Sequence, residues 1–198
     1  MRRESLLWSA GLGLSSRLGG GFGAVAFHMR REEAFVGTYQ IFDLPLGAMI
    51  SAAFLMSTLG ESEVHLWGEE DAAVSFYLRP HYSFGDSDVV KPDLVFNSHS
   101  LTEMSHEQAS TYIGSLDRLG AEYFLHANHE YGTGYTSPGG TKGRHLVVGR
   151  DVKLSENWRR AFRGPELLQN DGRVFGAFDY WEELWVNVAE RRLSRRRR

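Results

Sequence analysis

Residues 93–126, DLVFNSHSLTEMSHEQASTYIGSLDRLGAEYFLH, carry the pattern of a strand, a helix and a second strand. The run 93–97 is compact and apolar, which suits the centre of a sheet. Residues 105–108, SHEQ, have the spacing of a capping box, with serine at the start of the helix and glutamine three residues later. Apolar residues then recur at helical spacing until Gly120, which predicts the end of the helix. Residues 122–126 are typical of the next strand.

The same alternation extends toward the amino terminus. Residues 39–42 are rich in β-forming side chains and stop at Asp43, two residues before a proline suited to the first turn of a helix. Residues 46–59 are apolar on most faces, which predicts a buried helix ending at Gly60. Residues 74–78 indicate a further strand. Strands that alternate with helices predict an α/β fold with a mostly parallel sheet covered on both faces.

The pattern changes after residue 126. Residues 132–143 are rich in glycine and read as a long, mobile loop. Residues 145–149 and 173–176 are candidate closing strands, so the sheet can end in an antiparallel strand. The segment 180–188 contains two tryptophans and is ambiguous between a helix and an edge strand.

Length and composition limit the classes of protein. The chain has 198 residues, of which 42% are hydrophobic, so a disordered chain is excluded and a single domain over residues 1–190 is expected. The absence of cysteine excludes disulfides, thiolate zinc sites and cysteine nucleophiles. No apolar run approaches the roughly 18 residues needed to cross a bilayer.

Charge is distributed unevenly. The net charge is −3, but six arginines lie in residues 191–198, so residues 1–190 carry −9. An acidic body does not resemble a nucleic-acid surface. The basic tail is expected to be solvated and disordered, with contact to RNA or to an anionic lipid as the alternative. The apolar stretch near the amino terminus is short and broken by glycine at 11 and 13, unlike a secretory signal. We therefore expect a cytoplasmic protein without a nucleic-acid partner.

The local motif that points most clearly to a ligand site is LGGGFGA at residues 18–24. Gly19, Gly21 and Gly23 form a G-x-G-x-G turn, which brings backbone N–H groups close to a nucleotide-like ligand. With Ala24 the same letters also satisfy the dinucleotide-binding variant G-x-G-x-x-A. A glycine-rich turn without a ligand remains the alternative for this motif taken alone.

Asp43 follows the glycine turn by 20 residues and stands at the end of the next strand. In nucleotide-binding α/β sheets an acid at this place accepts hydrogen bonds from ribose hydroxyls. The alternative is that Asp43 caps the helix beginning near Pro45. Together, glycine turn and acid favour a ligand site at the carboxyl ends of the strands.

A polar string, Asn97, Ser98, His99 and Ser100, directly follows the buried strand and is expected to face the same crevice as Asp43. Glu103 comes four residues after His99, within reach if the turn is helical. A histidine and a glutamate at this spacing suit a general base with its orienting partner. A polar strand-to-helix connection with local hydrogen bonds is the alternative.

The sequence resembles the sugar O-methyltransferase family, a branch of the S-adenosylmethionine-dependent methyltransferases with the Rossmann-like fold. The resemblance rests on GGGFG, on DLPLGAMISAAFL from Asp43, and on DLVFNSHSLTEMSHE from Asp93. It extends from about Leu18 to about Tyr131, more than half of the chain. It implies transfer of a methyl group from S-adenosylmethionine to a hydroxyl of a sugar or sugar-containing metabolite.

The resemblance also implies roles by position. Gly19, Gly21 and Gly23 would approach the methionine part of the cofactor, Asp43 would hold its ribose, and Leu44 would lie beside the adenine. Asn97 and Ser98 would border the methionine end. His99 and Glu103, together with His126 and His129, would face the acceptor, and we choose His99 as the base from its chemistry and position.

Two features depart from the family. An acidic residue usually stands two places before the first motif glycine, and here Arg17 occupies that place. Residues 11–16, GLGLSS, make a poor first strand because they are rich in glycine and serine. Relatives also tend to be longer at the amino end, so a shortened or diverged member is expected. A degenerate, non-catalytic domain and a NAD-dependent oxidoreductase remain as alternatives.

His126, His129 and Glu130 together resemble a metal-ligand cluster. The order H-x-x-H-E is not a recognised metal-binding spacing, and the end of a strand does not present all three side chains to one ion. The sequence therefore predicts no metal site. The sequence contains no pattern that identifies the acceptor or the oligomeric state.

Overall fold

The structure is a computed structural model, and it describes residues 14–31, 37–70, 74–86, 89–130, 134–136, 142–144, 149–166 and 180–189. The chain divides into two compact units, residues 1–96 and 97–198. The strands are β1 (Leu14–Leu18), β2 (Thr38–Asp43), β3 (Val64–Leu66), β4 (Phe76–Pro80), β5 (Leu94–Ser98), β6 (Tyr123–His129), β7 (Gly134–Thr136), β8 (Lys142–Arg144), β9 (Trp158–Pro165) and β10 (Tyr180–Asn187). The α-helices are α2 (Ala24–Arg31), α3 (Pro45–Leu59) and α4 (His106–Leu119).

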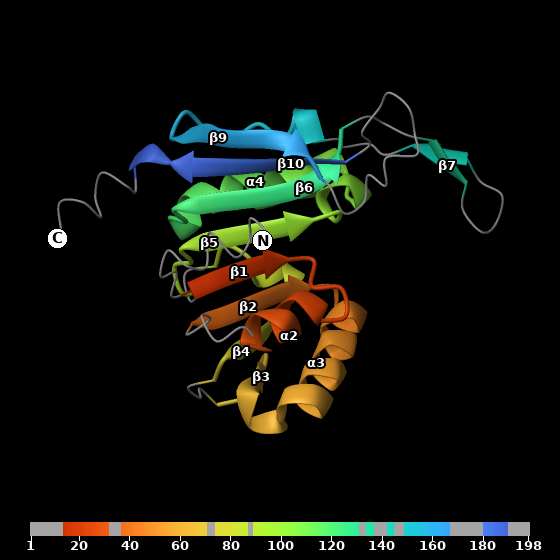
Figure 1. The fold of residues 1–198 in the computed structure, drawn as a ribbon, viewed down its shortest axis with the longest axis vertical. Coiled ribbons are helices and arrows are strands. Elements are labelled where there is room, and N and C mark those ends of the chain that lie inside the picture. The colour runs from red at the N-terminus through yellow and green to blue at the C-terminus, as the bar shows by residue number, and fades with distance from the viewer. Residues whose placement is uncertain are drawn as a thin grey trace. The chain divides into compact units, whose positions relative to one another are not determined.

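The first unit is built on a parallel sheet with the strand order β3-β4-β2-β1. Helices α2 and α3 lie alongside these strands (Figure 1). Apolar side chains from both helices and from β2, β3 and β4 form the core of this unit; its buried members are Ala26, Met29, Tyr39, Ile41, Ala52, Leu55, Val64, Phe76 and Leu78. Through Tyr39 and Ile41 this core packs against β2, the strand that ends at Asp43.

The weak first strand that the sequence predicts is not what the structure shows. All five residues of β1 pair in parallel with β2. Ser15 and Ser16 are buried, and Nε2 of Gln40 donates to Oγ of Ser16 over 3.3 Å. Parallel pairing with β2 satisfies the backbone of this strand, and the contact with Gln40 gives Ser16 a side-chain partner, so the strand forms despite its small polar residues. Residues 11–13 lie outside the described ranges.

Helix α3 has the predicted bounds, beginning at Pro45 and ending before Gly60. The expectation that it is buried on most faces is wrong. Ser51, Ala52 and Leu55 pack inward, whereas Leu46 and Met49 are 69% and 68% exposed. The helix contacts β2, β3, β4 and α2, and its side chains Phe54, Met56 and Leu59 pack against the core in part. Its large exposed apolar side chains, Leu46, Met49 and Ile50, all lie in its first half.

The second unit contains the helix predicted from residues 105–119. Ser105 accepts a hydrogen bond from the backbone N–H of Gln108, and the Gln108 side chain accepts one from the N–H of Ser105, which confirms the capping box. Gly120 ends the helix in a left-handed conformation with φ of 66°. Both ends of α4 therefore follow from local sequence.

Antiparallel pairing closes the sheet in the second unit. Strand β10 pairs antiparallel with both β6 and β9, which places it between them and settles residues 180–187 as an interior strand. Strand β9 has no counterpart among the predicted elements. Of the candidate strand at 145–149, only Gly149 is described, and it begins a 3₁₀ turn. The candidate strand at 173–176 and the basic tail at 191–198 lie outside the described residues.

Part of the predicted loop at 132–143 is ordered as a hairpin-like pair. Strands β7 and β8 pair antiparallel there, although the loop was expected to lack structure. Within the described ranges, no helix is both long and apolar enough to cross a bilayer. The single-domain boundary at residue 190 stays a prediction.

Candidate functional site

The glycine turn follows β1 directly and leads into α2. Gly19, Gly21 and Gly23 have φ values of 78°, 61° and 91°, a region that residues with a side chain rarely adopt. The N–H of Gly19 donates to the carbonyl of Phe42 over 2.9 Å, which ties the turn to the end of β2. A virtual Cβ at Gly21 meets nothing within 4 Å, so the tip of the turn borders open space.

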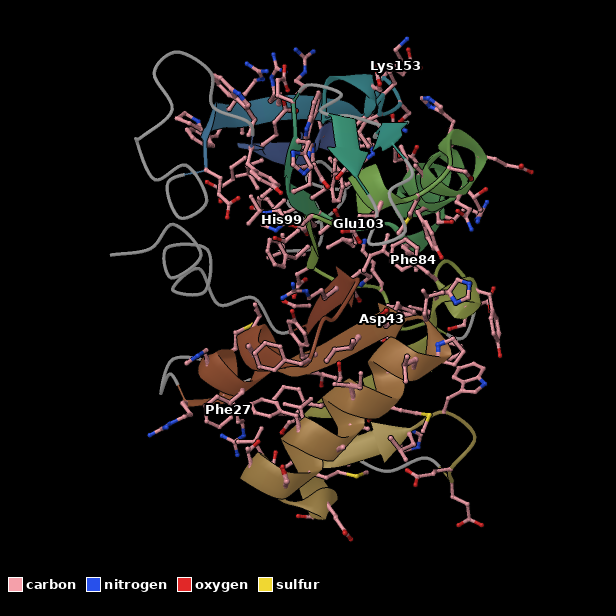
Figure 2. The ribbon with its side chains drawn as sticks, turned by 90° about the vertical axis from the view of Figure 1, so that its right-hand side faces the viewer. Phe27, Asp43, Phe84, His99, Glu103 and Lys153 are labelled. Atoms are coloured by element: carbon pink, nitrogen blue, oxygen red, sulfur yellow. The ribbon has the colours of Figure 1, made fainter. Side chains whose placement is uncertain are left out.

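Asp43 ends β2 and fastens the turn from the other side (Figure 2). Its Oδ2 accepts a hydrogen bond from the N–H of Gly20 over 2.7 Å, and its Oδ1 accepts one from the N–H of Leu44 over 2.7 Å. Helix α3 has Leu44 at its N-cap with no side-chain cap, so Asp43 does not cap this helix. Each carboxylate oxygen keeps a lone pair that can accept from a ligand hydroxyl.

Close packing leaves no room for a side chain at Gly47, where α3 passes this carboxylate. A Cβ at Gly47 would lie 2.6 Å from both Cγ and Oδ1 of Asp43. Oγ of Ser51, a buried residue of α3, donates to the carbonyl of Gly21 over 2.8 Å. The start of α3 therefore supports both the acid and the turn, and Gly47 belongs to the site although its letter alone does not reveal that.

Replacing Gly47 with alanine is expected to displace the Asp43 carboxylate. The clash should outweigh the gain in helix propensity, which is at most about 1 kcal/mol, and lower the free energy of unfolding by about 1–2 kcal/mol. Chemical denaturation measures this change, with Gly114→Ala in α4 as the control because a Cβ there meets nothing within 4 Å. A Gly47→Ala protein more stable than the wild type would contradict the prediction.

Arg17 lies next to the glycine turn as well. Its Nε donates to the carbonyl of Gly19 over 2.7 Å, and its guanidinium lies 5.0 Å from the centre of the Phe96 ring. Both contacts hold the arginine against the glycine turn. In the family that the sequence resembles, an acidic residue usually occupies this position. The site therefore combines one carboxylate and one cation.

In the second unit, His99 adopts a left-handed backbone conformation with φ of 64°, which is uncommon for a residue with a side chain. Its Nε2 lies 2.9 Å from Oε2 of Glu166, which follows β9. Strained residues cluster at functional sites because the surrounding structure must hold them. Because an ionised carboxylate only accepts, this contact suits the neutral imidazole tautomer that has its hydrogen on Nε2 and a lone pair on Nδ1.

The pairing of His99 with Glu103 is not what the structure shows. Glu103, labelled with His99 in Figure 2, ends a 3₁₀ turn after β5 and is exposed. The ring nitrogen Nε2 of His99 contacts Glu166 instead. The reason is that His99 leaves the strand with a positive φ, whereas the i to i+4 expectation needs helical dihedrals at that residue. A role for Glu103 toward the acceptor stays a prediction.

Tyr180 joins the two histidines at this end of the strands. The centre of its ring lies 4.4 Å from that of His99 and 3.9 Å from that of His129. The backbone of Tyr180 also accepts from the N–H of Glu166 over 3.0 Å. The ends of β5, β6 and β9 and the start of β10 thus bring His99, His129, Glu166 and Tyr180 together, and we call these four residues the histidine cluster.

A buried polar network lies behind the histidine cluster. Asn97 is fully buried, and its Oδ1 accepts a hydrogen bond from Nδ2 of Asn128 over 3.0 Å. The same amide of Asn128 lies 3.4 Å from Nδ1 of His126. His126 is also fully buried, so in this structure it belongs to the network and not to an acceptor surface.

Glu183 is the anion of this network. Its Oε1 accepts from Arg160 over 3.1 Å and from Arg163 over 2.8 Å, and Nε2 of His126 lies 3.6 Å from its Oε2. Burial disfavours the charged carboxylate, but the interactions with His126, Arg160 and Arg163 outweigh burial and hold the pKa of Glu183 below its usual range. Arg163 also bonds Glu130, which links the network to the end of β6.

The remaining predicted residues occupy distinct environments. Leu44 is 60% exposed beside Asp43, and Ser98 is half-buried at the end of β5. Among the residues that the structure describes, no group of three or more histidine or acidic side chains is arranged to hold a metal ion. The convergence of the glycine turn and the histidine cluster on one crevice stays a prediction.

Sequence reasoning missed Glu166, Tyr180 and Glu183. Glu166 lies 67 residues from its partner His99, and no periodicity or motif connects positions so far apart. Tyr180 stands in the aromatic segment whose secondary structure was ambiguous. Once that segment is placed as a strand beside β6, its first residue falls opposite His129, so the strand pairing was the information that sequence lacked.

No protein-family model matches the sequence, and no curated protein matches it either. Solved structures do resemble the fold. The glycopeptide N-methyltransferase MtfA, complexed with S-adenosyl-L-methionine, aligns with a TM-score of 0.60 and 13% identity, covering 93% of this chain and 86% of that one. Mitomycin 7-O-methyltransferase MmcR aligns with a TM-score of 0.56 and 12% identity, covering 93% of this chain and 54% of that one.

Magnesium protoporphyrin IX methyltransferase (ChlM) from Synechocystis PCC 6803, with bound S-adenosyl-L-methionine, aligns with a TM-score of 0.55 and 13% identity. The alignment covers 93% of this chain and 77% of that one. At these identities the likeness concerns the fold. The chain has the Rossmann-like α/β fold of these methyltransferases, with a mostly parallel sheet and an antiparallel closing pair, as the sequence predicted.

Proposed function

We propose that this protein is an S-adenosylmethionine-dependent methyltransferase that transfers a methyl group to a hydroxyl of a sugar or sugar-containing metabolite. The observation that carries the proposal is the glycine turn fastened to Asp43 at the carboxyl ends of β1 and β2. Ligands of open parallel sheets bind at this edge. Two similar folds, those of MtfA and ChlM, were solved with S-adenosylmethionine bound, which supports the same cofactor here.

The residues at the turn fit an adenosyl cofactor. Open space at Gly21 permits close approach of a ligand to the backbone, and the free lone pairs of Asp43 suit the two ribose hydroxyls. Leu44 offers an exposed apolar side chain next to Asp43, where an adenine would lie. The bound cofactor supplies an electrophilic methyl group on a sulfonium, so the protein has to orient the acceptor and remove one proton.

His99 is proposed as the group that removes this proton. Glu166 holds the Nε2 hydrogen and thereby leaves Nδ1 free to accept the proton of an acceptor hydroxyl. A hydroxyl needs such a base because a neutral hydroxyl is a weak nucleophile, and its methylation without removal of the proton would form a high-energy protonated ether. Glu166 acts here as a positioning residue, whereas Glu103 remains a candidate for contact with the acceptor.

The sugar-type acceptor rests on the sequence resemblance and on the character of the histidine cluster. Tyr180 provides an aromatic surface beside two imidazoles and a carboxylate, a combination that can pack against a sugar ring and hydrogen-bond to its hydroxyls. Asn97 and Ser98, at the end of β5, are proposed to border the methionine end of the cofactor.

Calorimetric titration with S-adenosylhomocysteine tests the cofactor site. We expect one-to-one binding to the wild type and a loss of at least tenfold in affinity in Asp43→Asn, because the amide keeps the size but replaces one acceptor oxygen by a donor. NAD is the comparison ligand. Binding of NAD without S-adenosylhomocysteine would make the protein an oxidoreductase, and no binding of either by a folded sample would favour a non-catalytic domain.

A further inference from the structure

We propose that Arg17 binds the carboxylate of the amino-acid part of the cofactor. The inference rests on the proposed function, because it concerns the same glycine turn. It assigns a ligand-binding role to a residue whose charge is opposite to that of the acid expected at its position. The chemical group recognised is a carboxylate attached to an adenosyl nucleoside through a short chain.

The first argument is the position of the guanidinium. Arg17 is the penultimate residue of β1, and its Nε donates to the carbonyl of Gly19, the first glycine of the turn, over 2.7 Å. Its guanidinium also stacks 5.0 Å from the centre of the Phe96 ring. These two contacts restrain the side chain, so that a ligand would meet a cation already in place.

The second argument is an unsatisfied donor. Nη1 of Arg17 is buried and has no hydrogen-bond partner among the described residues. A buried N–H of a cation is costly when it lacks an acceptor, and such groups in native proteins usually have a partner that the protein or a ligand provides. A carboxylate suits it best, because arginine presents planar N–H groups in the geometry of carboxylate oxygens.

The third argument is the charge balance of the turn. Asp43 is the anion of the site, but both of its oxygens already accept backbone hydrogen bonds from Gly20 and Leu44 and do not contact Arg17. The cofactor carries an ammonium and a carboxylate on its amino-acid part. A cation at position 17 favours contact with the carboxylate, where an acid would favour the ammonium.

Three ligands separate this contact from the rest of the site: S-adenosylhomocysteine, its decarboxylated analogue, and 5′-methylthioadenosine, which lacks the whole amino-acid part. The variant is Arg17→Met, which removes the guanidinium but keeps an unbranched side chain at this position beside β2. We expect it to weaken S-adenosylhomocysteine binding roughly 10- to 100-fold, the range for a charge-assisted pair. Affinities for the other two ligands should change less than about twofold.

The design compares the loss of the guanidinium with the loss of the carboxylate, so it isolates their interaction. Equal weakening of all three ligands in Arg17→Met would overturn the proposal and make Arg17 a support of the turn. Unchanged affinity for S-adenosylhomocysteine would overturn it as well. Asp43→Asn is the matched control, since it should weaken all three ligands through the ribose that they share.

Two further outcomes separate this proposal from the proposed function. A wild type that binds S-adenosylhomocysteine and its decarboxylated analogue equally well keeps the cofactor site but overturns the role of Arg17. A wild type that binds none of the three ligands overturns both, whether or not it binds NAD. If Arg17→Met does not fold, Arg17→Lys is used instead. Its preference for S-adenosylhomocysteine over the decarboxylated analogue should be smaller than that of the wild type, because lysine lacks the planar guanidinium.

Discussion

Replacing His99 with asparagine is expected to lower turnover roughly 100- to 10,000-fold, the range for loss of a general base. Asparagine is the right replacement because it tolerates the positive φ of this residue better than alanine does. The measurement is release of S-adenosylhomocysteine with whichever member of a panel of sugars and sugar nucleotides the wild type methylates fastest. Affinity for S-adenosylhomocysteine should stay within about twofold, because His99 is proposed to face the acceptor.

An equal loss of turnover and cofactor affinity would make His99 a structural residue. A second comparison then tells which carboxylate positions the ring. Glu166→Gln should reduce the rate at saturating acceptor more than Glu103→Gln does, because only Glu166 contacts Nε2. If Glu103→Gln has the larger effect on this rate, the helical pairing expected from sequence forms during catalysis and the contact with Glu166 does not matter.

The largest expected effect on stability is that of Glu183→Ala. Glu183 is 3% exposed and accepts hydrogen bonds from Arg160, Arg163 and the indole of Trp185. Its removal takes this acceptor from Arg160, from Nε of Arg163 and from the indole of Trp185, while Nη2 of Arg163 keeps Glu130. It also removes the carboxylate that lies 3.6 Å from Nε2 of His126. We expect a loss of about 3 kcal/mol in the free energy of unfolding, at the low end for buried pairs because both arginines are partly exposed.

Urea denaturation measures this loss, and Glu156→Gln is the control because Glu156 is exposed. The control should stay within about 0.5 kcal/mol of the wild type. A Glu183→Ala protein as stable as the control would mean that the arginines and His126 find other partners, and the network would then contribute no stability.

The same carboxylate makes part of the stability depend on pH. Since the folded state holds the pKa of Glu183 below its usual range, the contribution is complete above the unfolded pKa of about 4.3 and is lost as pH falls through the lower folded pKa. The stability difference between wild type and Glu183→Gln should therefore be constant near neutral pH and shrink below about pH 4. A difference that does not change between pH 7 and pH 3 would contradict this cause.

Several elements were readable from local sequence. The capping box at Ser105 and the left-handed Gly120 delimit α4, and Pro45 and Gly60 delimit α3. The glycine turn and Asp43 were paired from their spacing alone, and the structure joins them through Gly20. These features depend on hydrogen bonds and dihedrals between near neighbours or on a recurring β-turn-α geometry, so a single sequence suffices to predict them.

Other features depended on which distant segments lie side by side. The exposed face of α3, the interior position of β10 and the contact of His99 with Glu166 all required the strand order and the packing of elements. Apolar composition does not tell how much of a helix the sheet covers, and no local rule brings Glu166 to His99. The sequence by itself determined the α/β pattern and the turn with its acid, because those follow from local geometry. Two features were decided only by the tertiary structure: the contact of His99 with Glu166, and the burial of Nη1 of Arg17 without a hydrogen-bond partner among the described residues. Both arise from contacts between segments that are brought together by folding.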